Sequence, residues 1–302
     1  MKILQKATFV VATVMAIVLT VSGPVSAATS PNLGTANSFA ILAGTAVTNV
    51  PTSVIGWDVG LSPAAGSNYA GLTSAEVSGT IYAADATGPA GSANNPGLLT
   101  TAKTDLVAAY DGLAGGANAD ANCLPGYKFG MGNLELTGKN LVPGVYCGDT
   151  ITLSGTLNLS GTGVWVFRSA DTLITSGTAN IIGGDPCNVW WQVPSSATLG
   201  TNTSLVGNIL ALTSISMRTG ATLNGRALAR NAAVTLESNT ISNATCASAN
   251  TAGSSPTVVP TLPKTGVNFN DHKVLWMAVA FTLLASATTF FFLAGQKKKV
   301  TK

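Results

Sequence analysis

Side chains able to do acid–base or nucleophilic chemistry are scarce in this 302-residue chain. The single histidine, His272, lies near the C-terminus, in a segment that we expect to be removed. Without a histidine, the rest of the protein has no Ser-His-Asp or Cys-His catalysis and no histidine metal site. Asp58 and Glu76 could cleave a glycoside only as a close pair, which their spacing does not indicate. Asp58 is better interpreted as an acceptor for backbone amides at a turn. We therefore predict a protein that is not an enzyme and needs no metal or cofactor.

Aromatic and basic side chains give no clear binding motif. Four tryptophans could stack on sugars, namely Trp57, Trp165, Trp190 and Trp191. Alternation along a strand buries at least one of the adjacent pair Trp190 and Trp191, so core packing is the better interpretation. Arg226 and Arg230 lie four residues apart in a strand-like segment and hence on one face. We interpret both arginines as structural or salt-bridged.

Small hydroxyl residues recur at the first and fourth positions of short segments such as 198–201 and 235–238. Side by side on a rigid surface, their methyl and hydroxyl groups could order water into an ice-like lattice. The alternative is that threonine merely suits strands and loop corners. The candidate residues are Thr45, Thr48, Thr175, Thr178, Thr198, Thr201, Ser216, Thr219, Thr235 and Ser238.

The elements that must position these residues are short strands separated by glycine and asparagine. Equivalent positions such as Thr198, Ser216 and Thr235 are 18 and 19 residues apart. A period near 20 with short strands predicts a β-solenoid, in which stacked coils place equivalent side chains about 4.8 Å apart. One segment differs, because Asn95-Pro96 resembles a helix start and apolar residues then recur at three- and four-residue steps up to Gly115-Gly116. We predict one amphipathic helix there, with its apolar stripe against the strands.

The N-terminus has the pattern of a secretory signal peptide. Lys2 and Lys6 precede an apolar run over 7–21, and Val25-Ser26-Ala27 supplies the small residues of a cleavage site. We predict a signal peptide over 1–27, with cleavage after Ala27 or Ala28. The alternative, an uncleaved membrane anchor, fits less well because the apolar run is short.

Outside the cell, cysteines can form disulfides, and this chain has four. One or two bonds are expected, and the sequence leaves all three pairings open. The candidate disulfide residues are Cys123, Cys147, Cys187 and Cys246.

The C-terminus carries a pentapeptide, an apolar stretch over 274–294 and a lysine-rich tail over 295–302, in that order. The stretch is long enough to span a bilayer, and the lysines would stay cytoplasmic. The arrangement resembles the sorting signal of sortase transpeptidases, which implies cleavage after Thr265 and attachment of Thr265 to peptidoglycan. The partners implied are sortase and peptidoglycan, with the membrane only before sorting. The pentapeptide residues are Leu262, Pro263, Lys264, Thr265 and Gly266.

Both processing steps change the charge of the protein. The full chain has 15 basic and 12 acidic residues, of which the removed segments carry seven and one, leaving 8 and 11. A net charge of about −3 gives no basis for nucleic-acid binding. The predicted order is therefore a signal peptide, one domain over 28–246, a linker over 247–261, the sorting motif 262–266, a membrane span over 274–294 and the tail. We expect the protein to be secreted and anchored covalently to the cell wall.

The predicted domain resembles the microbial ice-binding protein family over almost its whole length. The matching segments are 33–44 (LGTANSFAILAG), 56–63 (GWDVGLSP), 143–146 (PGVY), 188–193 (NVWWQV) and 225–230 (GRALAR). The resemblance implies an irregular right-handed β-solenoid of triangular section with one long helix alongside. It also implies ice contact through a face marked T-A/G-x-T/N, which corresponds to the hydroxyl residues named above. Leu199, Met217 and Leu236 depart from this pattern at its second position, and Arg218 and Glu237 at its third.

The sequence therefore predicts a mainly β, wall-anchored ice-binding protein that adsorbs to ice crystals through a flat Thr/Ser-rich face. The alternative is a cell-surface adhesin of the same fold that binds a different surface or polymer.

Overall fold

A computed structural model describes residues 28–116 and 122–242 of the chain. The chain divides into two units, 1–249 and 250–302, and every element described below belongs to the first. The predicted signal peptide, Cys246, linker, sorting motif, membrane span and tail lie outside the described residues. Within the described ranges, no helix is long and apolar enough to cross a membrane.

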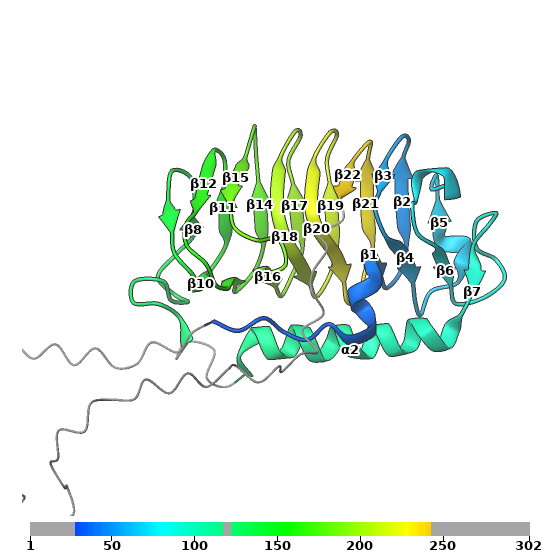
Figure 1. Ribbon diagram of the computed structural model, residues 1–302, viewed down its shortest axis with the longest axis horizontal. Helices are drawn as coiled ribbons and strands as arrows, with labels where there is room; N and C mark the ends of the chain where they lie inside the picture. Colours follow the sequence, from blue (N-terminus) through cyan, green and yellow to red (C-terminus); the bar gives the residue numbers. More distant parts are fainter. Residues whose placement is uncertain (1–27, 117–121, 243–302) are drawn as a thin grey trace, which may run out of the picture. The chain divides into compact units, whose positions relative to one another are not determined.

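The strands lie in three parallel rows (Figure 1). We call the first the helix-side row, because the long helix packs against it. Its order is β10 (Gly144–Gly148), β13 (Trp165–Ser169), β16 (Val189–Val193), β18 (Ser204–Ala211), β20 (Thr222–Ala229), β1 (Phe39–Ala43), β4 (Asp58–Leu61), β6 (Ile81–Ala83) and β7 (Ala93–Asn94).

The second, which we call the open row, contains the first halves of β18 and β20, whose second halves belong to the helix-side row. Its order is β9 (Asn140–Leu141), β12 (Thr156–Leu159), β15 (Asn180–Gly183), β18, β20, β22 (Thr240–Ser242) and β3 (Val54–Ile55).

The third row is a separate eight-stranded sheet. Its order is β5 (Tyr69–Ala70), β2 (Val47–Val50), β21 (Val234–Glu237), β19 (Ile215–Met217), β17 (Ala197–Leu199), β14 (Leu173–Thr175), β11 (Ile151–Leu153) and β8 (Leu134–Glu135). Short 3-10 turns over Gly34–Ser38, Gly66–Asn68 and Ser74–Glu76 complete the described elements.

Alternation along the short strands builds the core between the rows. In β19, Ile215 and Met217 point inward and are fully buried, whereas Ser216 between them is partly exposed. Inward side chains of successive coils stack on one another, as in Phe167 on Trp191, whose ring centroids are 4.2 Å apart. The mainly β, stacked-coil prediction is confirmed.

The predicted helix is α2 (Pro96–Ala114). Asn95 caps its start by accepting a hydrogen bond from the Leu98 amide at 3.1 Å, and Gly115 ends it in the left-handed conformation (φ 78°). Its buried stripe is Leu99, Ala102, Leu106, Ala109, Tyr110 and Leu113. Figure 1 shows α2 running along most of the helix-side row. Its 19 residues span about 28 Å, and the six strand steps between its contacts with β6 and β13 span about 29 Å.

The coils do not stack in chain order. Strands β1, β2 and β3 pair with β20, β21 and β22, so the N-terminal coils stack on the C-terminal ones in the middle of the solenoid. We call this junction the seam. In Figure 1, the blue N-terminal strands lie directly beside the yellow C-terminal strands. The chain then returns along α2 and begins its remaining coils at the far end.

Polar groups hold the seam and connect α2 to its border. The guanidinium of Arg226, which is fully buried, donates to the Asn37 carbonyl at 2.9 and 3.1 Å and to Asn208 Oδ1 at 2.9 Å. It also lies 4.1 Å from the ring centroid of Trp57. Arg230 Nη1 is 2.9 Å from Asp111 Oδ1 on α2. The predicted structural role of the two arginines is confirmed.

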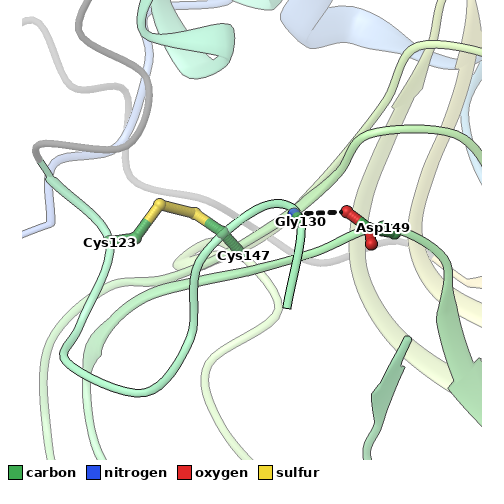
Figure 2. Close-up of a disulfide and its surroundings, with 4 residues drawn as sticks. All are labelled: Cys123, Gly130, Cys147 and Asp149. Carbon is green, nitrogen blue, oxygen red and sulfur yellow. Dashed lines mark hydrogen bonds between the residues drawn. A yellow bond between two sulfur atoms is a disulfide. The ribbon is translucent and has the colours of Figure 1, made fainter. Parts of the chain in front are cut away.

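A disulfide fixes the loop that covers the β10 end of the solenoid (Figure 2). Cys123 is bonded to Cys147 of β10, and the loop amides of Gly130 and Gly132 donate to the Asp149 carboxylate at 2.7 and 3.1 Å. Cys187 is disulfide-bonded as well. The prediction of disulfides is therefore confirmed. Of the three cysteines that could pair with Cys123, the structure identifies Cys147.

Other side chains considered for chemistry have structural roles. The sequence predicted that at least one of Trp190 and Trp191 packs in the core. In the structure both side chains are buried. Asp58 Oδ1 accepts a hydrogen bond from the Thr80 amide at 2.8 Å, as predicted. Burial alone would raise the pKa of Glu76, but hydrogen bonds, first from the Ser53 amide, outweigh it and lower the pKa.

Candidate functional site

On six strands of the eight-stranded sheet, from β11 to β2, the middle residue points outward and is uncharged. Each lies between two inward residues, and the strand register places them side by side. We call this the central column. Its members, from β11 to β2, are Thr152, Ile174, Thr198, Ser216, Thr235 and Thr48.

A second column, which we call the leading column, lies two residues earlier on the same six coils. Backbone hydrogen bonds continue the ladder through it, for example from the Ala197 amide to the Ser214 carbonyl at 2.9 Å. Its members are Thr150, Thr172, Ser196, Ser214, Ala233 and Ala46. Neighbouring coils are about 4.8 Å apart and residues i and i+2 of a strand about 6.7 Å apart, so the columns form a regular grid.

The chemistry of this grid is uniform. Nine of its 12 positions carry a hydroxyl group, the other three carry alanine or isoleucine, and none is charged. Some hydroxyls bond along the columns, with Ser196 Oγ 2.9 Å from Ser214 Oγ and Thr48 Oγ1 donating to Thr235 Oγ1 at 3.2 Å. These bonds fix the orientation of the four side chains that make them.

Nine of the ten predicted hydroxyl residues fall in three places. Thr48, Thr198, Ser216 and Thr235 lie in the central column. Thr178, Thr201, Thr219 and Ser238 are exposed in the turns that follow the sheet strands, and Thr45 is exposed in the turn before β2.

The prediction that Thr175 faces outward is wrong. Its side chain is 2% exposed, its hydroxyl lies 2.7 Å from that of Thr203, and it accepts a hydrogen bond from the Gly200 amide at 2.9 Å. The register pairs Ile174 with Thr198, so the segment similarity was displaced by one residue. The register is set by the inward packing of Leu173 against its neighbours. The recurrence of threonine does not determine it.

The leading column was missed, although its signal is present in the sequence. Thr150 and Thr152, Ser196 and Thr198, and Ser214 and Ser216 form pairs spaced by two residues that recur with the coil period.

The structure shows where the residues that depart from the T-A/G-x-T/N pattern at its second and third positions lie. Leu199, Met217 and Leu236 are buried and point into the core, so they do not interrupt the face. Arg218 and Glu237 point outward beside the central column and form an ion pair, with Arg218 Nη1 3.3 Å from Glu237 Oε1.

The grid is a surface and not a cleft. Two hollows of about 220 and 250 Å³ lie at the β10 end, and the columns line neither. Fold and site together define a class of protein: a parallel β-solenoid with one long helix that presents an uncharged, regularly spaced hydroxyl face.

Comparison with known proteins identifies the family of the chain. The Ice-binding-like family matches residues 41–242, and the chain belongs to this family. It is 40% identical over 216 residues to an ice-binding protein of Flavobacterium frigoris (strain PS1), covering 70% of this chain and 75% of the relative. It is 39% identical over 226 residues to an ice-binding protein of Nostoc sp. (strain HG1), covering 72% and 76%.

Solved structures agree with this assignment. The domain of Shewanella frigidimarina ice-binding protein 1 aligns with a TM-score of 0.61 at 29% identity, covering 73% of this chain and all of that one. A glycosylated ice-binding protein from Arctic yeast aligns with a TM-score of 0.62 at 31% identity, covering 73% and 97%. Both share the mainly β fold with parallel sheets and a single helix.

Proposed function

We propose that this protein binds ice through the face formed by the leading and central columns. The observation that carries the proposal is the strand register, continued by backbone hydrogen bonds one step before the strands, which arranges 12 uncharged side chains on six adjacent coils. The names of the relatives, each an ice-binding protein, support the same function.

The physical basis is the ordering of water. Hydroxyl groups on a rigid grid hold first-shell waters at repeated positions, and the intervening methyl groups leave those waters to bond with one another. Ionised groups would hold water in their own orientation, and the 12 grid positions contain none. The nearest carboxylate along the central column is that of Glu135 on β8, which pairs in register with Thr152 and accepts a hydrogen bond from its hydroxyl at 2.9 Å, so the grid ends there. An ordered first layer can then join the lattice of a crystal. Contact with a crystal plane also requires a flat surface. We propose that the three rows form a right-handed solenoid of triangular section whose eight-stranded side is flat.

Thermal hysteresis, crystal shaping and recrystallisation inhibition test the proposal on residues 28–261, which include every described element. Ser216→Tyr, at the middle of the central column, is expected to abolish most of the activity by holding the ice surface away. The matched control is Ser204→Tyr, an exposed position in the open row, which is expected to leave the activity unchanged. Wild-type protein that behaves like buffer would remove the ice proposal and favour adhesion to another surface.

We also propose that the protein works while covalently attached to the cell wall, so that it holds the cell to ice or shields its surroundings. The support is the LPKTG pentapeptide followed by an apolar stretch and a lysine tail. Expression in a sortase-bearing Gram-positive host tests it. Muramidase should release wild-type protein from washed walls, whereas Thr265→Ala should leave the protein in the membrane fraction. Equal wall attachment of both forms would contradict the proposal.

A further inference from the structure

We infer that the Arg218–Glu237 ion pair is a boundary that sets the width of the ice-contacting surface, and thereby its choice of ice plane. The inference rests on the proposed function and concerns a third column beside the central one, which we call the trailing column. Its members, two residues after those of the central column, are Ser154, Ser176, Gly200, Arg218, Glu237 and Val50.

The trailing column faces the same side as the other two. Glu237 is the last residue of β21 and is paired in register with Val50 of β2. Arg218 continues the ladder after β19, since its amide donates to the Leu199 carbonyl at 2.9 Å. The Ser176 amide likewise donates to the Leu153 carbonyl at 3.0 Å. Alternation therefore directs these side chains outward, next to the proposed contact grid.

The two halves of the trailing column differ chemically. Over β11, β14 and β17 it holds Ser154, Ser176 and Gly200, which are small and uncharged. Over β19 and β21 it holds a guanidinium and a carboxylate. Over β2 it holds Val50, which is apolar and 58% exposed. On the first half the grid therefore continues into a third column, whereas over β19 and β21 it ends at the central column.

The ion pair is fixed in place. Arg218 Nη1 lies 3.3 Å from Glu237 Oε1, and Glu237 Oε2 accepts hydrogen bonds from the amide and the hydroxyl of Thr219 at 3.2 and 3.1 Å. The Arg218 side chain is 58% exposed, so it remains hydrated. Exposed pairs of this kind add little stability, which leaves their effect on nearby water as the main consequence.

Charged groups next to the grid end the ice-like order there, because they orient water around themselves. Removing the Arg218–Glu237 pair should extend the uncharged trailing column over β19 and β21. Introducing an ion pair over β11 and β14 should shorten the uncharged trailing column there. Ser154 and Ser176 are adjacent in register, because their preceding residues Leu153 and Thr175 are paired. They therefore reproduce the placement of Arg218 and Glu237.

The experiment compares two double variants of the 28–261 protein. Arg218→Ser with Glu237→Ser is expected to raise thermal hysteresis at equal concentration and to add ice planes that labelled protein decorates. Ser154→Arg with Ser176→Glu is expected to lower thermal hysteresis and to remove planes. Circular dichroism at the assay temperature checks that both variants are folded.

The matched control is Arg230→Ser with Asp111→Ser, which removes an ion pair of 2.9 Å on the α2 side and should leave ice activity unchanged. If both test variants behave like wild type while Ser216→Tyr is inactive, the boundary inference is overturned and the proposed function stands. If wild-type protein is inactive, activity in the double-serine variant would support the boundary, and its inactivity would overturn it.

Discussion

At the scale of single residues, Ile174 is the one member of the central column without a hydroxyl group. Its side chain lies between Thr152 and Thr198 in register and is 43% exposed. Ile174→Thr keeps a branched side chain and adds the missing hydroxyl. We expect higher thermal hysteresis, with a change in the free energy of unfolding within about 0.5 kcal/mol, as for most surface changes.

The control for this change is Ile182→Thr, which makes the same substitution at a residue of the open row that is 54% exposed. It should leave ice activity as it was. A rise in both variants would mean that added hydroxyl groups act anywhere on the surface, and a rise in neither would mean that the central column is not the contact.

Arg226 is a residue whose loss should affect stability. Arg226→Met leaves the Asn37 carbonyl and Asn208 Oδ1 without their donor inside the seam. Each unsatisfied buried group costs about 1–3 kcal/mol, so we expect the free energy of unfolding to fall by about 2–6 kcal/mol. Urea unfolding measures it, and exposed Arg218→Met serves as the control with a small effect. A loss below about 1 kcal/mol would contradict the assigned role of Arg226.

Residue positions on the face were only partly predictable from the sequence. The repeats aligned Thr198, Ser216 and Thr235 in the register that the strands adopt, because there the threonine period and the packing period coincide. They failed at Thr175 because Thr175-Ser176-Gly177-Thr178 imitates the motif one residue out of register. Register depends on which side chains fit the core, and this information is spread over neighbouring coils.

At the scale of elements, α2 was the most predictable part of the fold. Its limits are set locally, by the Asn95 cap with Pro96 at the start and by Gly115 at the end, so no distant residue is needed to define them. The individual strands were harder to delimit, since most are three to five residues long and take their bounds from partners in other coils.

The loop that covers the β10 end depends on its disulfide. The bond joins residues 24 apart, and closing a loop of this length stabilises a protein by about 3 kcal/mol. Cys123→Ser with Cys147→Ser should lower the free energy of unfolding by about 2–4 kcal/mol in urea. Ice activity near 0 °C should persist, because the contact columns lie on other strands. Lost ice activity in a folded variant would show that this end takes part in binding.

At the scale of the whole described domain, stability should depend on pH in the alkaline range. Burial, followed by the charge of Arg230, lowers the pKa of Lys103 from 10.5 to about 8. Between these values the unfolded chain binds the extra proton, so the free energy of unfolding rises with pH. Burial raises the pKa of Tyr146 from 10 to about 12, so the stability that it contributes below pH 10 is lost between pH 10 and 12.

We therefore expect urea unfolding to give a maximum in stability near pH 10. Lys103→Met should abolish the rise above pH 8 while leaving the fall above pH 10. Tyr146→Phe removes the titrating hydroxyl. It should keep the rise in the free energy of unfolding above pH 8 and reduce the fall above pH 10. A flat profile in wild-type protein would contradict both assignments.

The seam was the part of the architecture that the sequence did not reveal. The repeats imply that coils stack. However, no sequence pattern within β1 or β20 predicts that Ile41 pairs with Ala227. That pairing is specified by groups such as Arg226 and Asn37, which lie 189 residues apart and satisfy each other only in the folded protein.

The length of α2 limits how this domain can grow. Each added coil would lengthen the strand rows by about 4.8 Å, whereas one helical residue adds about 1.5 Å. An inserted coil would therefore need about three more residues in α2, nearly one turn, or part of the helix-side row would lose its apolar cover. Lineages that enlarge the ice-facing surface should consequently show paired insertions, one in the repeats and one in the helix. Designers who wish to extend it must change both segments together.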